Sequence, residues 1–196
     1  MFDRMDLKVR LDTDNDIRRI VDRFRLQHCT RGAKTFYESS EYGRFEGIHL
    51  KIEHNILKMV CSIHKFFFKS AMGILDNSGS FTISQARAAL RTLFNDVDID
   101  VSHVTVTYFE IGLNMRLSRE ANEYIRLVSS VGENRKLFND ANFEENRQKT
   151  TEKSRCRSKV LKMYDKSFEY RSKGKAVESN ILRLETSYRR QNIPLS

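Results

Sequence analysis

The residue in this sequence that is best suited to carry out a reaction is a tyrosine with cationic neighbours, in the run Tyr164-Asp165-Lys166. A free phenol has a pKa of about 10, and nearby positive charge or a metal ion stabilises its phenolate form. Tyr164 is therefore a candidate nucleophile, with an ordinary half-buried tyrosine as the alternative. Tyr108 and Tyr170 are its rivals, because one lies near a strand carboxylate and the other just past the run.

Two carboxylates lie within apolar, strand-like stretches. Glu110 is central in residues 104–113, and Glu185 lies in the last strand-like stretch of the sequence. An unpaired carboxylate is costly to bury, so each of them needs a partner. That partner could be a basic neighbour such as Lys51 or Arg183, or a divalent cation, because Mg²⁺ and Mn²⁺ bind carboxylate oxygens. Glu110 is the first candidate metal ligand, and Glu185 is a weaker one.

His49 is a further, weaker candidate for a metal ligand. It lies in a strand-like stretch, and the turn predicted at His54-Asn55 sets His49 and His54 apart. A lone histidine in a strand is more often a structural hydrogen-bonding group, so both roles stay open from the sequence. The cofactor expected with these ligands is Mg²⁺ or Mn²⁺.

Positive charge is concentrated towards the end of the sequence. The whole chain carries 35 Lys and Arg against 26 Asp and Glu, whereas residues 147–175 hold eleven against three. Clustered cations gain free energy by displacing counterions from phosphates, so this basic segment predicts contacts with a nucleic acid backbone. A solvated helix face or a loop is the plainer interpretation, and the lack of a clean amphipathic period argues against a membrane-surface helix. The candidate DNA-contacting residues are Arg147, Lys149, Lys153, Arg155, Arg157, Lys159 and Lys162.

A mixed set of strands and helices must position these residues. Alternating apolar and polar residues predict strands near residues 2–11, 47–53, 56–64, 104–113, 159–164 and 181–188. Cap residues and helical spacing predict helices from Asp14 or Asn15 to Leu26, from Thr82 to Asn95, and from Ser118 to Ser129. Residues 29–43 are expected to form a loop with a short strand at 35–38. The fold class is therefore α+β, with a mostly antiparallel sheet and flanking helices.

The hairpin within residues 47–64 has a self-consistent register. A two-residue loop at His54-Asn55 pairs Ile52 with Leu57, Leu50 with Met59, and Ile48 with Cys61. All of these apolar side chains then share one face, which indicates that this face is buried.

Composition excludes several classes of protein. With 196 residues, 39% of them hydrophobic, the chain suits one domain spanning residues 1–196. Its longest apolar run, around Phe66 to Phe68, is far shorter than the roughly 20 residues that a membrane-spanning helix needs. The opening residues lack the apolar core of a signal peptide. Three cysteines are too few and too scattered for a disulfide framework or a zinc motif. We expect a reduced, cytoplasmic protein with no membrane partner.

Five stretches, in order, resemble one protein family. They are the Met-Phe-Asp opening before an alternating strand, a hairpin that ends in Ser-x-x-Lys-Phe at Phe66, and Glu-Ile-Gly-x-Asn at residues 110–114. The Tyr-Asp-Lys run at 164–166 and Leu-Arg-x-Glu at 182–185 complete the set. This series resembles the phage and plasmid replication initiators of the gene II/X type, which are relatives of the His-hydrophobic-His (HUH) endonucleases. The resemblance spans nearly the whole chain.

The resemblance implies a rolling-circle replication initiator, which is a metal-dependent DNA nickase and ligase with an HUH-endonuclease-like fold. Tyr164 would attack a phosphodiester, become joined to the 5′ phosphate and free a 3′ hydroxyl. Lys166 would neutralise charge on the attacked phosphate, and a divalent cation would polarise it. The implied partners are single-stranded or supercoiled origin DNA and the host replication machinery, in the cytoplasm of a bacterial host.

Three features depart from the family pattern. The sequence has no His-x-His pair, and Glu110 stands where an aspartate is expected. The sequence is also shorter than expected for the family and stops just after the stretch that carries Glu185. The alternative function is a non-catalytic DNA- or RNA-binding regulatory protein that keeps the same fold.

Overall fold

The computed structural model describes residues 2–40, 47–74, 79–131, 136–139, 143–151, 159–177 and 179–195. The chain forms two compact units, the first comprising Met1–Phe109 with Arg190–Ser196 and the second Glu110–Arg189. Two long strands, β6 (Thr105–Leu117) and β11 (Asn180–Pro194), contribute residues to both units. That residues 1–196 act as one replication initiator domain stays a prediction.

The first unit contains an antiparallel sheet with strand order β2-β3-β4-β5-β1-β6. Its strands, besides β6, are β1 (Phe2–Arg10), β2 (Gln27–Arg31), β3 (Lys34–Glu38), β4 (Ile48–Glu53) and β5 (Ile56–Ser62). Its helices are α1 (Asp14–Phe24), α2 (Ile63–Met72), α3 (Ile83–Val97) and the short 3₁₀ helix η1 (Val101–His103).

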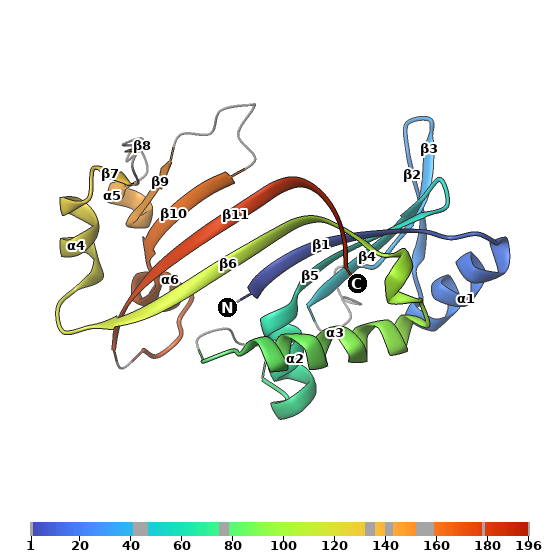
Figure 1. Cartoon of the computed structure of the whole chain (residues 1–196), viewed down its shortest axis with the longest axis horizontal. Helices are drawn as coiled ribbons and strands as arrows, with labels where there is room; N and C mark the ends of the chain where they lie inside the picture. The colour runs from blue at the N-terminus through green and yellow to red at the C-terminus, as the bar shows by residue number, and fades with distance from the viewer. Residues whose placement is uncertain are drawn as a thin grey trace. The chain divides into compact units, whose positions relative to one another are not determined.

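One face of this sheet is packed against helices. Figure 1 shows α2 and α3 along one side of β4, β5 and β1. The core joins alternate strand residues to apolar residues of the helices, among them Leu7, Leu50, Met59, Phe66 and Leu93. Because side chains alternate along a strand, the residues between them lie on the opposite face, which these helices leave uncovered.

Several of these elements form as the local sequence predicted. The β4–β5 hairpin has the expected register, with Ile52 opposite Leu57 and Ile48 opposite Cys61. His54 and Asn55 both have positive φ, as a tight two-residue turn requires. Thr82 and Gln85 form the predicted capping box at the start of α3.

The second unit contains strands in the order β6-β11-β10-β9-β8-β7. The further strands are β7 (Ser130–Val131), β8 (Lys136–Asn139), β9 (Gln148–Thr151) and β10 (Lys159–Asp165). The helices are α4 (Ala121–Leu127), α5 (Phe143–Asn146) and α6 (Lys166–Ser172). A small core on one face of β10 and β11 holds Ala121 and Ile125 of α4 with Phe143, Met163 and Leu182. The opposite face carries polar side chains.

The structure contains a large, mostly antiparallel sheet and several helices, which agrees with the predicted α+β class. Several local predictions differ from the structure. The strands expected at 104–113 and 181–188 are longer, because β6 continues to Leu117 and β11 to Pro194. The strand expected to reach residue 64 ends at Ser62, where α2 begins, because Ile63, Phe66 and Phe67 have helical spacing. Gln27–Arg31, expected in part as a loop, forms β2 and pairs with β3. The helix expected at 118–129 is the shorter α4.

None of the helices in the described parts of the chain is long and apolar enough to cross a membrane.

Candidate functional site

The pairing of β10 with β11 brings the predicted nucleophile to a carboxylate. Tyr164 lies opposite Arg183, and Lys162 lies opposite Glu185, so all four side chains share one face of this strand pair. Tyr164 Oη donates a hydrogen bond of 2.9 Å to Glu185 Oε1. Both side chains are buried, each with 6% of its surface exposed. Two residues proposed from the sequence for different roles therefore meet in one contact.

Arg183 is the third residue of this contact. It is fully buried, with 0% of its surface exposed. Its Nε donates to Glu185 Oε1 at 2.6 Å, and its Nη1 donates to Asn114 Oδ1 of β6 at 2.9 Å. Glu185 Oε1 thus accepts from both a phenol and a guanidinium, and the buried negative charge is balanced by Arg183.

Gly112 of β6 lets Arg183 lie flat against the backbone. A Cβ added at Gly112 would lie 2.6 Å from Arg183 Nη2 and 3.0 Å from Cζ. Such distances are shorter than van der Waals contact, and the guanidinium is held by hydrogen bonds on two sides. The glycine is therefore required by the close approach of Arg183.

We expect Gly112→Ala to destabilise the protein by about 1–3 kcal/mol, because the added methyl group overpacks a site that cannot relax. Urea unfolding measures the change. Ile111→Ala on the same strand is the control, since Ile111 is 38% exposed and lies on the opposite face. An unfolding free energy for Gly112→Ala within about 0.5 kcal/mol of the original protein would contradict this packing argument.

Two lysines lie around the tyrosine ring. Lys162 Nζ lies 3.7 Å from Glu185 Oε2 and 4.2 Å from the centre of the Tyr164 ring. Lys166 Nζ lies 5.7 Å from the Tyr164 ring centre and 4.7 Å from that of Tyr170. Both cations can interact with the negative face of the phenol ring. The sequence prediction of positive charge beside Tyr164 agrees with these contacts.

The Tyr-Asp-Lys run also starts a helix. Asp165 is the N-cap of α6, and its Oδ1 accepts a 2.8 Å hydrogen bond from the backbone N–H of Phe168. Lys166 is buried in the first turn, where its Nζ donates to Glu169 Oε2 at 2.7 Å. Glu169 also accepts from Lys173 at 2.5 Å. The helix cap and the lysine–glutamate pair fix the position of Lys166.

The environment keeps the Tyr164 phenol protonated. Burial, followed by the negative charge of Glu185, raises the pKa of Tyr164 well above its usual value near 10. The positive charge of Arg183 opposes this shift but is outweighed. Any nucleophilic attack by Tyr164 would thus need an acceptor for its proton, and Glu185 Oε1 is already in hydrogen-bond contact.

The pKa of Glu169 shifts in the other direction. Partial burial raises this pKa, but the hydrogen bonds from Lys166 and Lys173 outweigh that effect and lower it from 4.5 to about 2. A carboxyl group with a lowered folded-state pKa adds stability above its unfolded-state pKa and loses it as the pH falls through the folded-state value.

We therefore expect Glu169 to contribute stability that is lost between about pH 4.5 and pH 2. In Glu169→Gln this contribution is absent, so the stability difference from the original protein should shrink as the pH falls through that window. Thermal unfolding of both proteins between pH 7 and pH 2.5 measures this. A difference that stays constant with pH would contradict the assignment.

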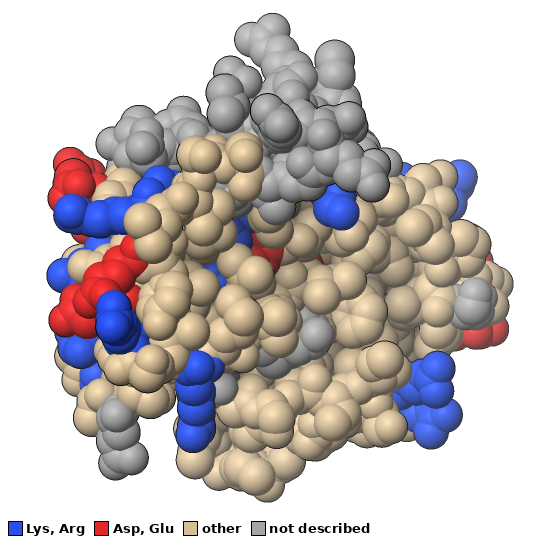
Figure 2. Space-filling view, turned by 60° about the vertical axis from the view of Figure 1, so that its left-hand side comes forward, with Lys and Arg blue, Asp and Glu red and all other residues tan. Residues whose placement is uncertain are grey.

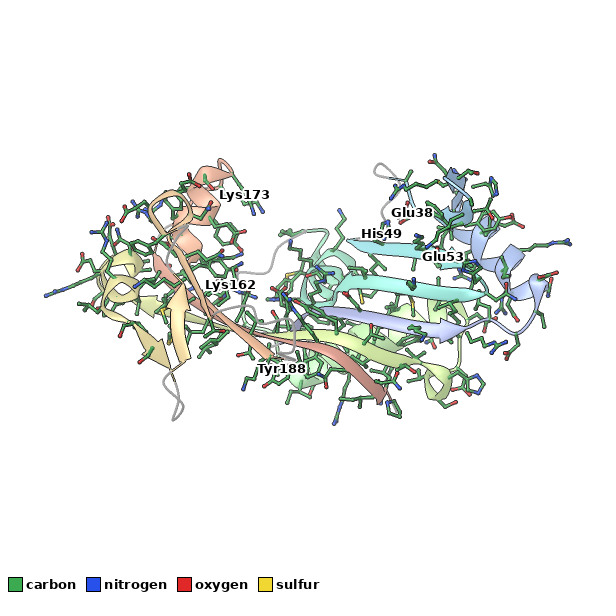
Figure 3. All side chains as sticks on the ribbon, turned by 90° about the horizontal axis from the view of Figure 1, so that it is seen from above. Glu38, His49, Glu53, Lys162, Lys173 and Tyr188 are labelled. Carbon is green, nitrogen blue, oxygen red and sulfur yellow. The ribbon has the colours of Figure 1, made fainter. Side chains whose placement is uncertain are left out.

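Glu110 and His49 have partners of their own. Glu110 Oε1 accepts a 3.2 Å hydrogen bond from Ser187 Oγ, and Ser187 shares a strand face with Glu185. His49 belongs to the first unit, where its Nε2 lies 3.0 Å from Glu38 Oε1. Figure 3 shows the His49 and Glu38 labels side by side on this unit. The structural alternative for His49, a hydrogen-bonding role, has a specific partner.

The arrangement around Glu185 does not fit a divalent cation as it stands. Tyr164 and Arg183 both donate to Oε1, and the Lys162 ammonium lies near Oε2. Among the residues that the structure describes, no three His, Cys, Asp or Glu side chains gather closely enough to hold a metal ion. The divalent cation stays a prediction from the sequence.

The predicted DNA-contacting residues fall into two sets. Lys153, Arg155 and Arg157 lie outside the described residues. Arg147 Nη1 lies 3.4 Å from Asp165 Oδ2 and 3.5 Å from Glu120 Oε2.

The three other predicted DNA-contacting residues, Lys149, Lys162 and Lys159, each have different surroundings. Lys149 is buried, and its Nζ donates to the carbonyl oxygens of Arg126 and Val128 at the end of α4. Lys162 faces Glu185. Lys159 is exposed, with its Nζ 5.3 Å from the Tyr188 ring centre.

Much of the described positive charge in the basic segment is therefore paired within the protein. On the face that Figure 2 shows, Lys and Arg side chains lie beside Asp and Glu at one edge, and other residues form most of the surface. This face shows no broad basic patch among the coloured, described residues. The contribution of residues 147–175 to DNA binding stays a prediction.

The rival tyrosines have different surroundings. Tyr108 belongs to the first unit, where the Arg4 guanidinium carbon lies 5.1 Å from its ring centre. Tyr170 is buried on α6, and Lys166 and Lys175 lie near its ring. Tyr164, by contrast, donates its hydroxyl hydrogen bond to the carboxylate of Glu185.

The sequence indicated Arg183 only as a possible basic partner of a strand carboxylate, and the structure pairs it with Glu185. Gly112 and Asn114 appeared only within the Glu-Ile-Gly-x-Asn stretch, and Glu169 had no predicted role. A signal for Arg183 was available, because an arginine two residues from a glutamate in a strand shares its face. Glu169 follows Lys166 at the helical spacing of i and i+3, which also favours an ion pair. Asn114 and Gly112 had no comparable signal, because their partner lies 69 residues from Asn114 along the chain.

Comparison with known proteins gives a distant likeness. No protein-family model matches the chain, and no curated protein matches it. Among solved structures, a rolling circle replication initiator protein from Geobacillus stearothermophilus has a TM-score of 0.48 and 9% sequence identity to this chain. The alignment covers 96% of this chain and 73% of that one.

Proposed function

We propose that this protein is a rolling-circle replication initiator in which Tyr164 attacks a DNA phosphodiester. The observation that supports the proposal most directly is the 2.9 Å hydrogen bond from Tyr164 Oη to Glu185 Oε1. It pairs a candidate nucleophile with a group able to accept its proton, which is the arrangement that nucleophilic catalysis by a hydroxyl requires. Two of the motifs that resemble the gene II/X initiators supply these residues: the Tyr-Asp-Lys run ends β10 and begins α6, and the Leu-Arg-x-Glu run lies on β11.

The step that follows from this geometry is a proton-coupled displacement. Tyr164 Oη forms a bond to phosphorus while its proton passes to Glu185 Oε1. The bond between phosphorus and the 3′ oxygen breaks, and that oxygen takes a proton from solvent to become a free hydroxyl, while Glu185 returns its proton to solvent. The 5′ phosphate remains joined to the tyrosine. Rejoining follows the same path in reverse, with the 3′ hydroxyl as the nucleophile.

The surrounding cations would favour this step electrostatically. The attacked phosphate gains negative charge in the transition state, and fixed positive groups near it lower the barrier. Lys162 and Lys166 both lie near the Tyr164 ring. Arg183 and its partners hold Glu185 in place, so we treat Arg183 as a positioning residue. The divalent cation implied by the resemblance stays a separate prediction.

One observation favours the second candidate, a non-catalytic DNA- or RNA-binding regulatory protein. Tyr164 is largely buried, and its pKa is raised rather than lowered. A tyrosine that only stabilises the strand pair would have these properties. The two functions differ in whether a covalent protein–DNA bond can form.

The test uses the whole protein with a pool of random-sequence single-stranded DNA and either Mg²⁺ or Mn²⁺. We expect a protein–DNA adduct that survives boiling in detergent, with mass spectrometry placing a nucleotide phosphate on the peptide that contains Tyr164. Salt-dependent binding of the same DNA without any adduct would support the regulatory function instead.

A further inference from the structure

We infer that the uncovered sheet face of the first unit, on β1, β4 and β5, binds the phosphate backbone of DNA. The inference rests on the proposed function only in choosing DNA as the polyanion. It does not depend on whether Tyr164 cuts DNA, and it concerns a surface that belongs to the other unit.

A row of lysines crosses the middle of this face. Lys8 of β1 lies directly opposite Lys58 of β5, and Lys58 lies directly opposite Lys51 of β4. Neighbouring strands are about 4.8 Å apart, so the row places three ammonium-bearing side chains on adjacent strands. Like charges directly opposite each other in a sheet are unfavourable, and a bound anion would offset that cost. We name Lys8, Lys51 and Lys58 the lysine row.

The ion pairs of Lys51 and Lys58 within the described residues depend on a single carboxylate, that of Glu53. Glu53 Oε2 lies 3.3 Å from Lys51 Nζ and 3.5 Å from Lys58 Nζ, and its other oxygen lies 3.9 Å from Lys34 Nζ. One carboxylate thus serves three ammonium groups, as the pKa of Glu53, which is lowered by its hydrogen bond with Lys51, also indicates.

Further cations extend the row along the strands. Alternation along β1 places Arg4 and Arg10 on the same face as Lys8, together with Asp6. Cations therefore outnumber carboxylates on this face. On β1, β4 and β5 its described cationic residues are Arg4, Lys8, Arg10, Lys51 and Lys58, and its carboxylates are Asp6 and Glu53.

Most of the described cations on this face are exposed to solvent. Lys8 is exposed, and the Lys58 and Arg4 side chains keep 51% and 47% of their surface exposed. Lys51 keeps 26%, and its Nζ lies 4.0 Å from the ring centre of Phe36 on β3. Helices α2 and α3 pack on the other side of these strands, where Leu7, Leu50 and Met59 are buried. Figure 3 shows side chains projecting from these strands, with Glu53 labelled near one end of the face.

The chemistry of the face fits a nucleic acid backbone better than a membrane surface. The large apolar side chains exposed in the described residues lie outside β1, β4 and β5. A membrane-surface site would need such side chains to enter the lipid. A flat row of cations without exposed aromatic rings on these strands instead suits phosphates, and predicts binding that is insensitive to base sequence.

The test measures the salt dependence of DNA binding by fluorescence anisotropy, with one random-sequence labelled duplex and its single strand. In the triple variant Lys8→Gln, Lys51→Gln and Lys58→Gln, we expect the slope of log K against log salt to fall by about two to three units. Each lost phosphate contact removes about 0.9 units for duplex and about 0.7 for a single strand. The triple Lys→Arg variant at the same positions should keep the original slope.

A matched control separates position from net charge. Arg18, Arg87 and Arg91 are exposed on α1 and α3, and replacing all three with Gln removes the same charge from the helix side of the unit. We expect this control to keep nearly the original slope. An equal loss in both triple variants would overturn the inference, because net charge alone would then explain it.

A second variant covers the case in which loss of the Glu53 partners unfolds the protein. Lys8→Gln with Arg10→Gln leaves the Glu53 contacts in place and should lower the slope by about one to two units. An unchanged slope in a folded variant would overturn the inference.

Binding to phosphatidylserine vesicles that falls in these variants while DNA binding stays unchanged would also overturn the inference, in favour of a membrane. Loss of slope with an intact Tyr164 adduct would support it, and absence of an adduct would count against the proposed function alone.

Discussion

Tyr164→Phe should eliminate the covalent DNA adduct, with a loss of several orders of magnitude that reflects removal of the attacking oxygen. Phenylalanine keeps the ring, its packing and its contacts with Lys162 and Lys166. Only the hydrogen bond to Glu185 is lost, and Arg183 still donates to the same carboxylate oxygen. The cost in stability should therefore be about 1 kcal/mol, the usual value for one hydrogen bond. DNA affinity should remain close to the original.

Tyr170→Phe is the matched control for this experiment. Tyr170 is also buried, carries the same functional group and lies next to Lys166, so the two variants differ only in which phenol oxygen is lost. Adduct formation should survive in Tyr170→Phe. If Tyr164→Phe still forms the adduct, or if Tyr170→Phe loses it, the nucleophile has been assigned to the wrong residue.

Features that depend on residues close together in the sequence were predictable. The β4–β5 hairpin follows from a two-residue turn and a matching apolar face, and the structure confirms its register. The start of α3 follows from Thr82 and Gln85, which satisfy each other's backbone groups within one turn. In these cases the information that decides the structure lies within a few residues.

Elements without an apolar pattern were not predictable. The residues of β2 are mostly exposed, so the strand has no buried face to reveal it, and pairing with β3 holds it in place. At Ile63, by contrast, an apolar pattern is present but is compatible with both a strand and a helix. The helix forms because Ile63 and Phe66 are both buried when spaced along one helix face.

The candidate site shows the same division. Tyr164 and Glu185 could each be selected by residue type and local pattern, but their hydrogen bond depends on the register of β10 with β11. The burial of Arg183 was harder to predict, because a charged residue in a strand is usually solvent-exposed. Its burial depends on Gly112 and Asn114 in a strand far away along the chain, which no local pattern reveals.

The burial of Arg183 leads to the second large effect. Arg183→Met should destabilise the protein by about 3–5 kcal/mol, because it removes one partner of a buried ion pair and leaves the charge of Glu185 poorly compensated. Methionine fills much of the same space and adds no charge, so the loss would report on the guanidinium rather than on a cavity. Urea unfolding measures the free energy. Arg126→Met is the control, because Arg126 is exposed on α4 and its ion pair with Glu144 lies at the surface.

The double variant Arg183→Met with Glu185→Gln tests whether the cost comes from the unbalanced charge. Glutamine keeps an oxygen that can accept from Tyr164 but carries no charge. The double variant should then be more stable than the sum of the single changes predicts, with a coupling free energy of about 1–3 kcal/mol. Additive effects, or a cost for Arg183→Met no larger than for Arg126→Met, would show that Arg183 does not hold Glu185 electrostatically. In that case Arg183 would lose its role as the residue that keeps the proton acceptor of Tyr164 in place.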